Sequence, residues 1–303
     1  MNKKKIDKVQ VDRFSRKANI PFSLLMTLVG FLGIFPFIFI IIVSLTSENA
    51  ILQNGYRFWP SEWSLDGYRY LSSMSKQILN ALMVSIMVTV LGTIINVSMT
   101  STYAYALSRP YLPFKKFFLV IIIIPMLLGA GLVPSYIVMT SVLNLKNTIW
   151  ALVLPAALGP FNIIIMRTFF KRSVPDSIIE SARIDGASEL RVFLQIVLPL
   201  SVPGIATIGL FAAIGYWNDW FNALLYITND KLYPLQYVLM NIQGSIDYML
   251  KNPAFGVNLS DLNIPKEATR MALVVIATLP IAVSYPFFQK YFISGLTIGG
   301  VKE

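Results

Sequence analysis

The sequence Ser173-Val-Pro-Asp-Ser-Ile-Ile-Glu-Ser-Ala-Arg-Ile-Asp-Gly-Ala-Ser-Glu-Leu-Arg-Val-Phe-Leu-Gln-Ile-Val-Leu-Pro-Leu-Ser201 is a charged, helix-prone segment in a chain that is otherwise strongly apolar. Ser173, Pro175 and Asp176 predict a helix start, with a hydroxyl cap, a proline in the first turn and an acid near the positive end of the helix dipole. Gly186 predicts the end of this helix, because glycine readily adopts the left-handed conformation that closes a helix. A second short helix is expected from Ser188 to about Val197, limited by Pro199. Two short helices joined at a glycine suit docking to a partner.

Composition indicates that most of the chain lies in a membrane. The 303 residues are 55% hydrophobic and 13% charged, whereas about a quarter of the residues of a soluble domain are charged. The formal net charge is +10, but the basic residues lie beside apolar segments rather than on a polar domain. This favours a protein of the lipid bilayer over one that binds nucleic acid.

The residue types that are missing exclude most catalytic chemistry. The sequence has no cysteine and no histidine. Disulfides, thiolate nucleophiles, Cys/His zinc sites and Ser-His pairs are therefore excluded, and we expect neither catalytic residues nor a metal site. The Gly-x-x-x-x-Gly-Lys-[Ser/Thr] loop that cradles the phosphates of ATP is also missing. If the chain moves a solute uphill, the energy must enter from another chain.

Hydropathy predicts an all-α transmembrane bundle of six spans. We expect these spans at about residues 21–45, 79–107, 117–140, 149–170, 202–227 and 270–288. Gly129, Gly131 and Pro134 predict a kink or an interruption in the second half of the third span. Residues 46–78 and 228–269 are then expected to be external loops.

The distribution of lysine and arginine predicts the orientation. These residues are concentrated at the amino terminus, in the 108–116 loop, around 167–191 and in the tail. The positive-inside rule therefore puts both termini and the 173–201 segment in the cytoplasm. We expect a multi-pass protein of the cell membrane, with a cytoplasmic segment at 1–20, a six-span domain at 21–290 and a cytoplasmic tail at 291–303.

The 173–201 segment resembles the cytoplasmic loop of ABC-importer permeases, which carries Glu-Ala-Ala, then Asp-Gly-Ala, then an apolar run that ends in Leu-Pro. The matching residues are Glu180-Ser181-Ala182, Asp185-Gly186-Ala187, Phe193, Ile196 and Leu198-Pro199. Ser181 departs from the pattern, in a small-for-small change. The alternative is an ordinary interfacial helix pair between two spans.

The resemblance implies a type I ABC importer permease fold, in which this loop is a coupling helix that docks into an ATP-hydrolysing partner. The implied coupling residues are Glu180, Ser181, Ala182, Asp185, Gly186, Ala187 and Pro199. The small residues among them would let the partner approach closely, and Glu180 would pair with a basic group of the partner. Asp185 is expected to cap the second helix or to hold the turn.

The carboxyl-terminal tail provides a second match. Phe287-Phe-Gln-Lys-Tyr-Phe292, Gly295-Leu-Thr297 and Gly299-Gly-Val-Lys302 are similar to the tail of carbohydrate permeases of the maltose-transporter type. The resemblance implies an extended tail that contacts the ATPase subunits through Gly295, Thr297, Gly299, Gly300 and Lys302. The alternative is a frayed, solvated tail. Residues 265–270 look typical of the branch that works with lipoprotein-anchored binding proteins and takes up oligo- or polysaccharide fragments.

A polar aromatic stretch, Tyr216-Trp-Asn-Asp-Trp-Phe-Asn222, lies in the predicted fifth span. An acid and two amides inside an apolar span are costly unless they face a bundle interior or a wet cavity. Aromatic faces beside hydroxyl-binding groups suit a sugar, and a similar Trp-Asn-Asp segment recurs in sugar permeases. The candidate pathway residues are Tyr216, Trp217, Asn218, Asp219 and Asn222. The alternatives are hydrogen bonds that hold helices together and a position at the outer interface.

Together these features predict a permease subunit that forms half of a carbohydrate pathway and works by alternating access. The resemblance implies a second homologous permease chain, two ATPase subunits that hold ATP and Mg²⁺, and an extracellular lipoprotein solute-binding protein. It implies no cofactor in this chain. A secondary sugar carrier is the alternative, disfavoured because Asp219 is the only acid placed well inside a span. A membrane glycosyltransferase is disfavoured because no paired carboxylates lie outside the spans.

Overall fold

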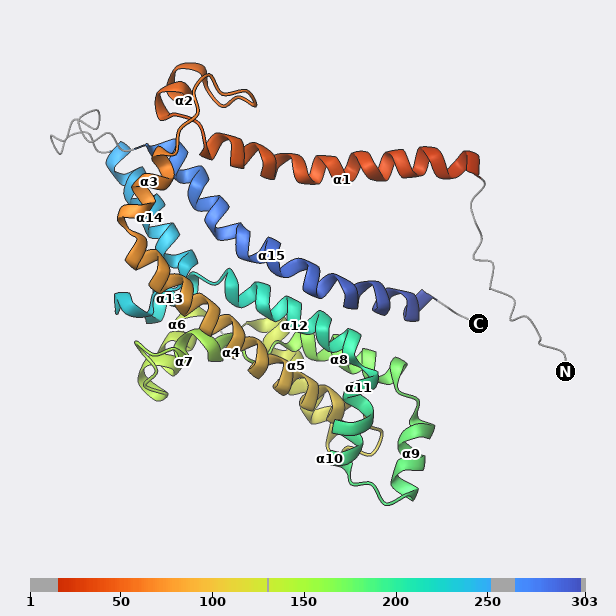
Figure 1. Ribbon diagram of the computed structural model, residues 1–303. Coiled ribbons are helices and arrows are strands. Elements are labelled where there is room, and N and C mark those ends of the chain that lie inside the picture. Colours follow the sequence, from red (N-terminus) through yellow and green to blue (C-terminus); the bar gives the residue numbers. More distant parts are fainter. Residues whose placement is uncertain (1–15, 130, 252–264, 301–303) are drawn as a thin grey trace. The chain divides into compact units, whose positions relative to one another are not determined.

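The computed structural model describes residues 16–129, 131–251 and 265–300, and nearly all of them are helical (Figure 1). Within these ranges no strand occurs; one isolated antiparallel bridge joins Thr46 and Trp63. The predicted all-α class is confirmed. The chain divides into two compact units, one formed by residues 1–71 and 264–275 and the other by 72–263 and 276–303.

The first unit contains α1 (Arg16–Ser44), α2 (Glu48–Asn54), most of α3 (Asp66–Ser73) and the amino end of α15 (Lys266–Gly300). Val43, Ile51 and Ala268 form its small core. The Glu48 carboxylate accepts hydrogen bonds from the backbone N–H groups of Glu267 and Ala268 at 3.0–3.1 Å, which caps α15. Residues 46–78 were expected to be a loop, and α2 and α3 were not predicted.

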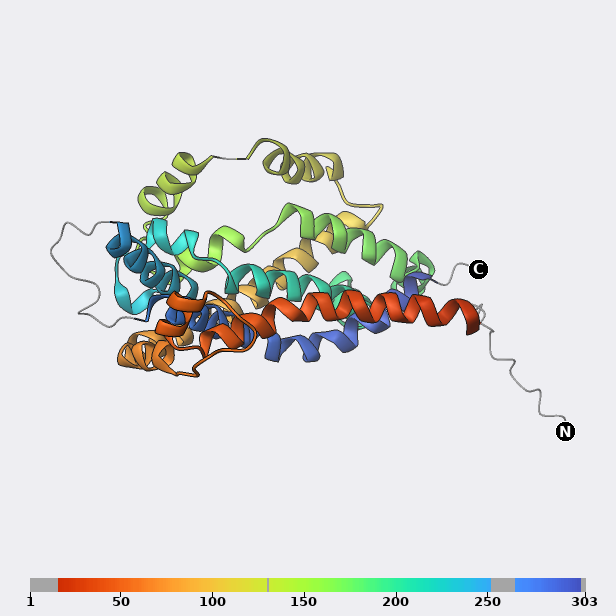
Figure 2. The ribbon, with the colours of Figure 1, turned by 90° about the horizontal axis from the view of Figure 1, so that it is seen from above.

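The second unit is built around α4 (Ser75–Ser108), α8 (Pro160–Ser173) and α12 (Val202–Trp217), which lie together in Figures 1 and 2. Small residues allow the close approach. A Cβ atom on Gly92 of α4 would lie 2.5 Å from the Tyr216 ring, and one on Gly204 of α12 would lie 2.7 Å from the Phe169 ring. Such contacts are typical of membrane helices, where packing rather than the hydrophobic effect drives association.

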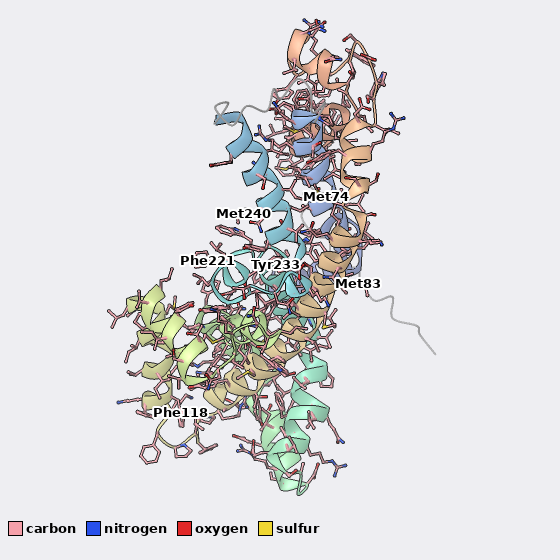
Figure 3. The ribbon with its side chains drawn as sticks, turned by 90° about the vertical axis from the view of Figure 1, so that its left-hand side faces the viewer. Met74, Met83, Phe118, Phe221, Tyr233 and Met240 are labelled. Carbon is pink, nitrogen blue, oxygen red and sulfur yellow. The ribbon has the colours of Figure 1, made fainter. Side chains whose placement is uncertain are left out.

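The remaining elements of this unit are shorter. They are α5 (Lys115–Leu128), α6 (Leu132–Ile137), the π-helical turn η1 (Val138–Val142), α7 (Trp150–Val153), the 3-10 turn η2 (Leu154–Ala156), α13 (Phe221–Tyr226), the 3-10 turn η4 (Asp230–Leu232) and α14 (Leu235–Lys251). Figure 3 labels Phe221, Tyr233 and Met240, from α13, the turn after η4 and α14. Helix α14 lies where an external loop was predicted, so that expectation was wrong for residues 235–251.

The helices are consistent with the predicted span number. Three are long and apolar enough to cross a membrane (Ile20–Ser44, Ser75–Ser108 and Lys266–Ser284), and up to six spans result if each of three bent helix pairs counts as one. The predicted interruption of the third span is confirmed. Helix α5 ends at Leu128 and α6 begins at Leu132, and the flanking Gly129 and Gly131 have φ angles of +56° and +76°.

Candidate functional site

The 173–201 segment forms the expected pair of helices, with different bounds. Helix α8 extends through Ser173, and α9 runs over Asp176–Ile184 after an extended Val174. The expected cap at Ser173 was therefore wrong, because Pro175 forces the preceding residue out of the helical region. The second helix begins as α10 (Glu189–Val192) and continues through the π-helical turn η3 (Phe193–Val197) and α11 (Leu198–Leu200). It passes Pro199 and bends by 82° into α12.

The turn between α9 and α10 is a Schellman motif. The Ala187 N–H donates to the Ala182 carbonyl at 2.9 Å, and the Gly186 N–H donates to the Arg183 carbonyl at 3.0 Å. Gly186 has φ +80°, which confirms it as the helix stop. The Ser188 hydroxyl caps α10 by accepting a hydrogen bond from the Arg191 N–H at 3.4 Å. The expectation that Asp185 caps the second helix was therefore wrong; Asp185 is the last residue of the first.

The helix pair has an inner apolar face and an outer polar face. Ile179, Val192, Phe193 and Val197 are buried in the core of the second unit, and Ala182 and Ala187 pack against that core. These two alanines therefore serve, at least partly, the packing of this chain itself. The predicted coupling residues Glu180, Ser181, Asp185, Gly186 and Pro199 are exposed. A Cβ atom on Gly186 would have no neighbour within 4 Å, so nothing in this chain occupies the space in front of it.

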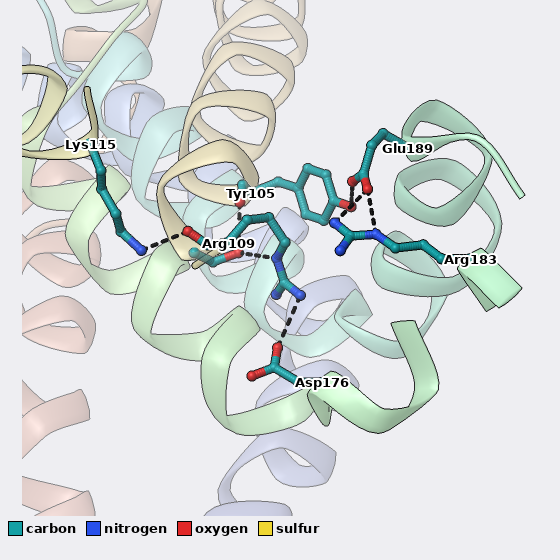
Figure 4. A network of polar contacts seen from close by, with 7 residues as sticks. Tyr105, Arg109, Lys115, Asp176, Arg183 and Glu189 are labelled. Carbon is teal, nitrogen blue, oxygen red and sulfur yellow. Dashed lines mark hydrogen bonds and ion pairs between the residues drawn. The ribbon is translucent and has the colours of Figure 1, made fainter. Parts of the chain in front are cut away.

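Polar contacts attach both helices to the carboxyl end of α4 (Figure 4). The Arg109 Nη1 atom lies 3.2 Å from Asp176 Oδ1, at the start of α9. The Tyr105 hydroxyl donates to Glu189 Oε2 at 2.8 Å, and Arg183 Nε donates to Glu189 Oε1 at 2.6 Å. The Arg109 side chain is 7% exposed and lies over the Tyr105 ring. The helix pair is thus connected to α4 at both of its arms.

Sequence reasoning missed this attachment. Arg109 was used only as one positive charge among several, and neither Tyr105 nor Glu189 was singled out. Tyr105 and Arg109 are four residues apart, so a helix places them on one face. Nothing in the sequence showed that this face meets a segment about 70–80 residues away.

The predicted tail contacts differ in conformation from expectation. Helix α15 runs through Gly300, so the backbone at Gly295, Thr297, Gly299 and Gly300 is helical rather than extended. Lys302 lies outside the described residues. The expectation of an extended segment over 295–300 was therefore wrong.

The predicted pathway residues divide into two groups. Tyr216 and Trp217 are buried at the end of α12, and both hold helices together. The Tyr216 hydroxyl donates to the Val153 carbonyl at 2.8 Å, and Trp217 Nε1 donates to the Ala277 carbonyl at 3.1 Å. These bonds support the interhelical alternative for the two aromatic residues.

The three polar residues mark a break in the span rather than its interior. Helix α12 ends at Trp217 and α13 begins at Phe221. Asp219 stabilises the restart, because its carboxylate accepts hydrogen bonds from the Asn222 N–H at 3.0 Å and from Asn222 Nδ2 at 2.5 Å. Asn218 is exposed at the break. Within the described residues, no group of three or more carboxylates could hold a metal ion.

Comparison with known proteins identifies the family. Residues 104–298, which include the α9–α10 pair and most of the second unit, match the family described as the inner membrane component of binding-protein-dependent transport systems. The chain belongs to this family. It is therefore a permease component, and the fold agrees. A crystal structure of a bacterial ABC transporter involved in the import of the acidic polysaccharide alginate contains a chain with a TM-score of 0.76 and 29% identity, covering 92% of this chain and 99% of that one.

Relatives of this permease component are transport proteins of the same length. The protein LplC of Bacillus subtilis (strain 168) is 42% identical over 90% of this chain and 91% of its own. The polygalacturonan/rhamnogalacturonan transport system permease protein YtcP of the same organism is 37% identical over 91% of this chain and 97% of its own. The arabinooligosaccharides transport system permease protein AraQ of Halalkalibacterium halodurans is 27% identical over 95% of this chain.

Proposed function

We propose that this chain is the permease subunit that forms half of the pathway for an oligosaccharide in an ATP-driven importer. The observation that carries the proposal is the α9–α10 pair. Its inner face is packed into the chain's own core, and its outer face presents Glu180, Ser181, Asp185 and Gly186 with nothing from this chain over Gly186. A chain that lacks a phosphate-binding loop needs such a surface to receive energy from an ATPase.

The assembly follows from the family. A second permease chain completes the pathway, two ATPase subunits bind ATP and Mg²⁺, and an extracellular solute-binding protein delivers the cargo. We place both termini and the α9–α10 pair in the cytoplasm, in keeping with the positive-inside rule. Closure of the ATPase dimer moves the helix pair, and the contacts to Tyr105 and Arg109 pass this movement to α4.

The cargo assignment rests on the named relatives, whose transport systems carry galacturonan, rhamnogalacturonan or arabinooligosaccharides. Asn218, exposed at the break after α12, is the residue that we assign to the pathway with most support. Asp219 and Asn222 hold its backbone in place. The aromatic side chains of Trp220 and Phe221 beside it are also exposed, as a stacking surface for sugar rings requires.

Affinity purification tests the proposal. Tagged protein extracted from native membranes should bring down an ATPase with a phosphate-binding loop, and the reconstituted complex should take up a labelled oligosaccharide only when ATP and the binding protein are supplied. A secondary carrier would instead take up sugar without ATP and would bring down no ATPase. Either of these two results would refute the proposal.

A further inference from the structure

A groove between α4, α5 and α8 lies next to a cluster of cationic side chains. The groove has a volume of about 510 Å³ and is lined mainly by apolar side chains: Met99, Ala106, Leu107, Leu112, Phe118 and Leu158. Figure 3 labels Phe118 on the first turns of α5. The Thr102 and Tyr103 hydroxyls in the lining donate to the Ser98 and Phe118 carbonyls at 2.8 and 3.2 Å, so they need no further acceptor. The groove therefore suits a hydrocarbon ligand.

The cations gather where three helix ends meet, at Ser108 of α4, Lys115 of α5 and Ser173 of α8. Lys115 lies within electrostatic reach of Arg109, Arg167 and Lys171. Arg167 Nε donates to the carbonyl of Leu107, a groove residue, and Lys115 Nζ donates to the Arg109 carbonyl at 2.7 Å. The cationic cluster thus begins at the mouth of the groove.

The cluster carries an excess of positive charge. The one acid within reach of Lys115 is Asp176, and it is paired with Arg109. In the part of the chain that the structure describes, Lys115, Arg167 and Lys171 have no carboxylate within ion-pair distance. The amino end of α5 adds the positive end of its helix dipole at the same place.

The depth of the groove matches that of a lipid tail. Its α4 residues lie between Ser98 and Leu107, one to ten residues before the end of that helix. At 1.5 Å per residue this is a depth of roughly 15 Å, about half the thickness of the hydrocarbon core. The exposed aromatic residues Tyr111, Phe114 and Phe117 lie beside the cations, as expected at the membrane–water interface.

We infer that this groove binds one anionic phospholipid, with a tail between α4, α5 and α8 and its phosphate held by Lys115, Arg167 and Lys171. Charge complementarity favours an anionic headgroup, since basic pockets at the ends of membrane helices select such lipids. The apolar groove favours a lipid over a free anion. The site lies at the end of α4 that also holds the α9–α10 pair, through Arg109. The inference does not depend on the cargo of the permease.

Photolabelling of the assembled transporter in lipid nanodiscs tests this inference. The probes are phosphatidylglycerol and phosphatidylcholine, each with a diazirine in the acyl chain and each at the same mole fraction. Phosphatidylglycerol should label peptides within residues 98–118 more strongly than phosphatidylcholine. Lys171→Gln should lower this labelling about fivefold, whereas Lys146→Gln, an exposed lysine outside the cluster, should leave it unchanged.

Two results would overturn the inference. Equal labelling by the two lipids, unaffected by Lys171→Gln, would show ordinary contact with the bilayer. Disulfide formation between Thr102→Cys and a cysteine on the second permease chain, without labelling by either lipid, would show that protein fills the groove. Cysteine placement is clean because the chain has no native cysteine. Ala106→Phe, which narrows the groove without removing charge, should also reduce labelling by phosphatidylglycerol.

Discussion

At the scale of single residues, the coupling turn owes its shape to Gly186 and its orientation to Arg109 and Glu189. The left-handed backbone at Gly186 closes α9 with two Schellman hydrogen bonds. Arg109 and Glu189 hold the two arms against the end of α4. Gly186 was predictable, because a glycine after a helix-prone run has a specific conformational reason. Arg109 and Glu189 were not, because their partners are distant in sequence.

Gly186→Phe should abolish co-purification of the ATPase while membrane insertion is retained. A large side chain would enter the space in front of the turn, which no atom of this chain fills. Gly55→Phe is the matched control, because Gly55 has a similar φ of +70° and also no neighbour within 4 Å of a Cβ atom. The two variants share the backbone strain, so only an effect specific to Gly186 supports the docking role. Equal loss of the ATPase in both would argue against it.

Arg109→Met should loosen α9 without lowering the stability of the fold by much. The guanidinium is buried, its Nη2 atom has no hydrogen-bond partner, and an apolar replacement for a buried charge is often neutral. The Asp176 side chain is largely exposed and tolerates the loss of its partner. Amide hydrogen exchange over residues 176–184 should become faster, and the thermal transition should move little. Unchanged exchange would mean that Arg109 does not hold the helix.

At the scale of elements, the spans were predictable because long apolar runs have few alternatives, whereas their breaks and the helix after α13 were not. Residues 228–269 were expected to form a loop because acids and bases balance there. Yet Leu235, Val238, Leu239, Ile242 and Ile246 repeat with the spacing of one helix face, and all are buried in α14. The periodicity was available and was overruled by charge. The break after Trp217 depends on the carboxylate of Asp219, which restarts the helix as α13.

Gly92→Ala should destabilise the contact between α4 and α12 by about 1–3 kcal/mol, the usual cost of overpacking. The added methyl group would lie 2.5 Å from the Tyr216 ring, whose hydroxyl is held by the Val153 carbonyl and so resists displacement. Gly215→Ala, in α12 with open space around its Cβ position, is the control. Thermal inactivation in detergent, followed by size-exclusion chromatography, compares the two. Equal stability of both variants would show that the helices are not tightly packed at Gly92.

At the scale of the whole molecule, membership of the family was predictable from one short segment, because Glu180, Asp185-Gly186-Ala187 and Leu198-Pro199 combine in a specific pattern. The cargo was not predictable, since Tyr216 and Trp217 are occupied in holding helices together. The central claim is that the outer face of α9–α10 receives the movement of a separate ATPase. It assigns energy input to this face and solute contact to the break after α12.

Cross-linking from one position tests this claim most directly. Ser181→Cys, on the exposed face of α9, is treated in native membranes with a short bifunctional reagent, and Asp230→Cys, exposed beyond α13, is the control. The account predicts that Ser181→Cys captures an ATPase subunit with a phosphate-binding loop, and that ATP changes the yield, whereas Asp230→Cys captures none. Failure of Ser181→Cys to capture an ATPase that co-purifies with the chain, or equal capture by Asp230→Cys, would contradict it.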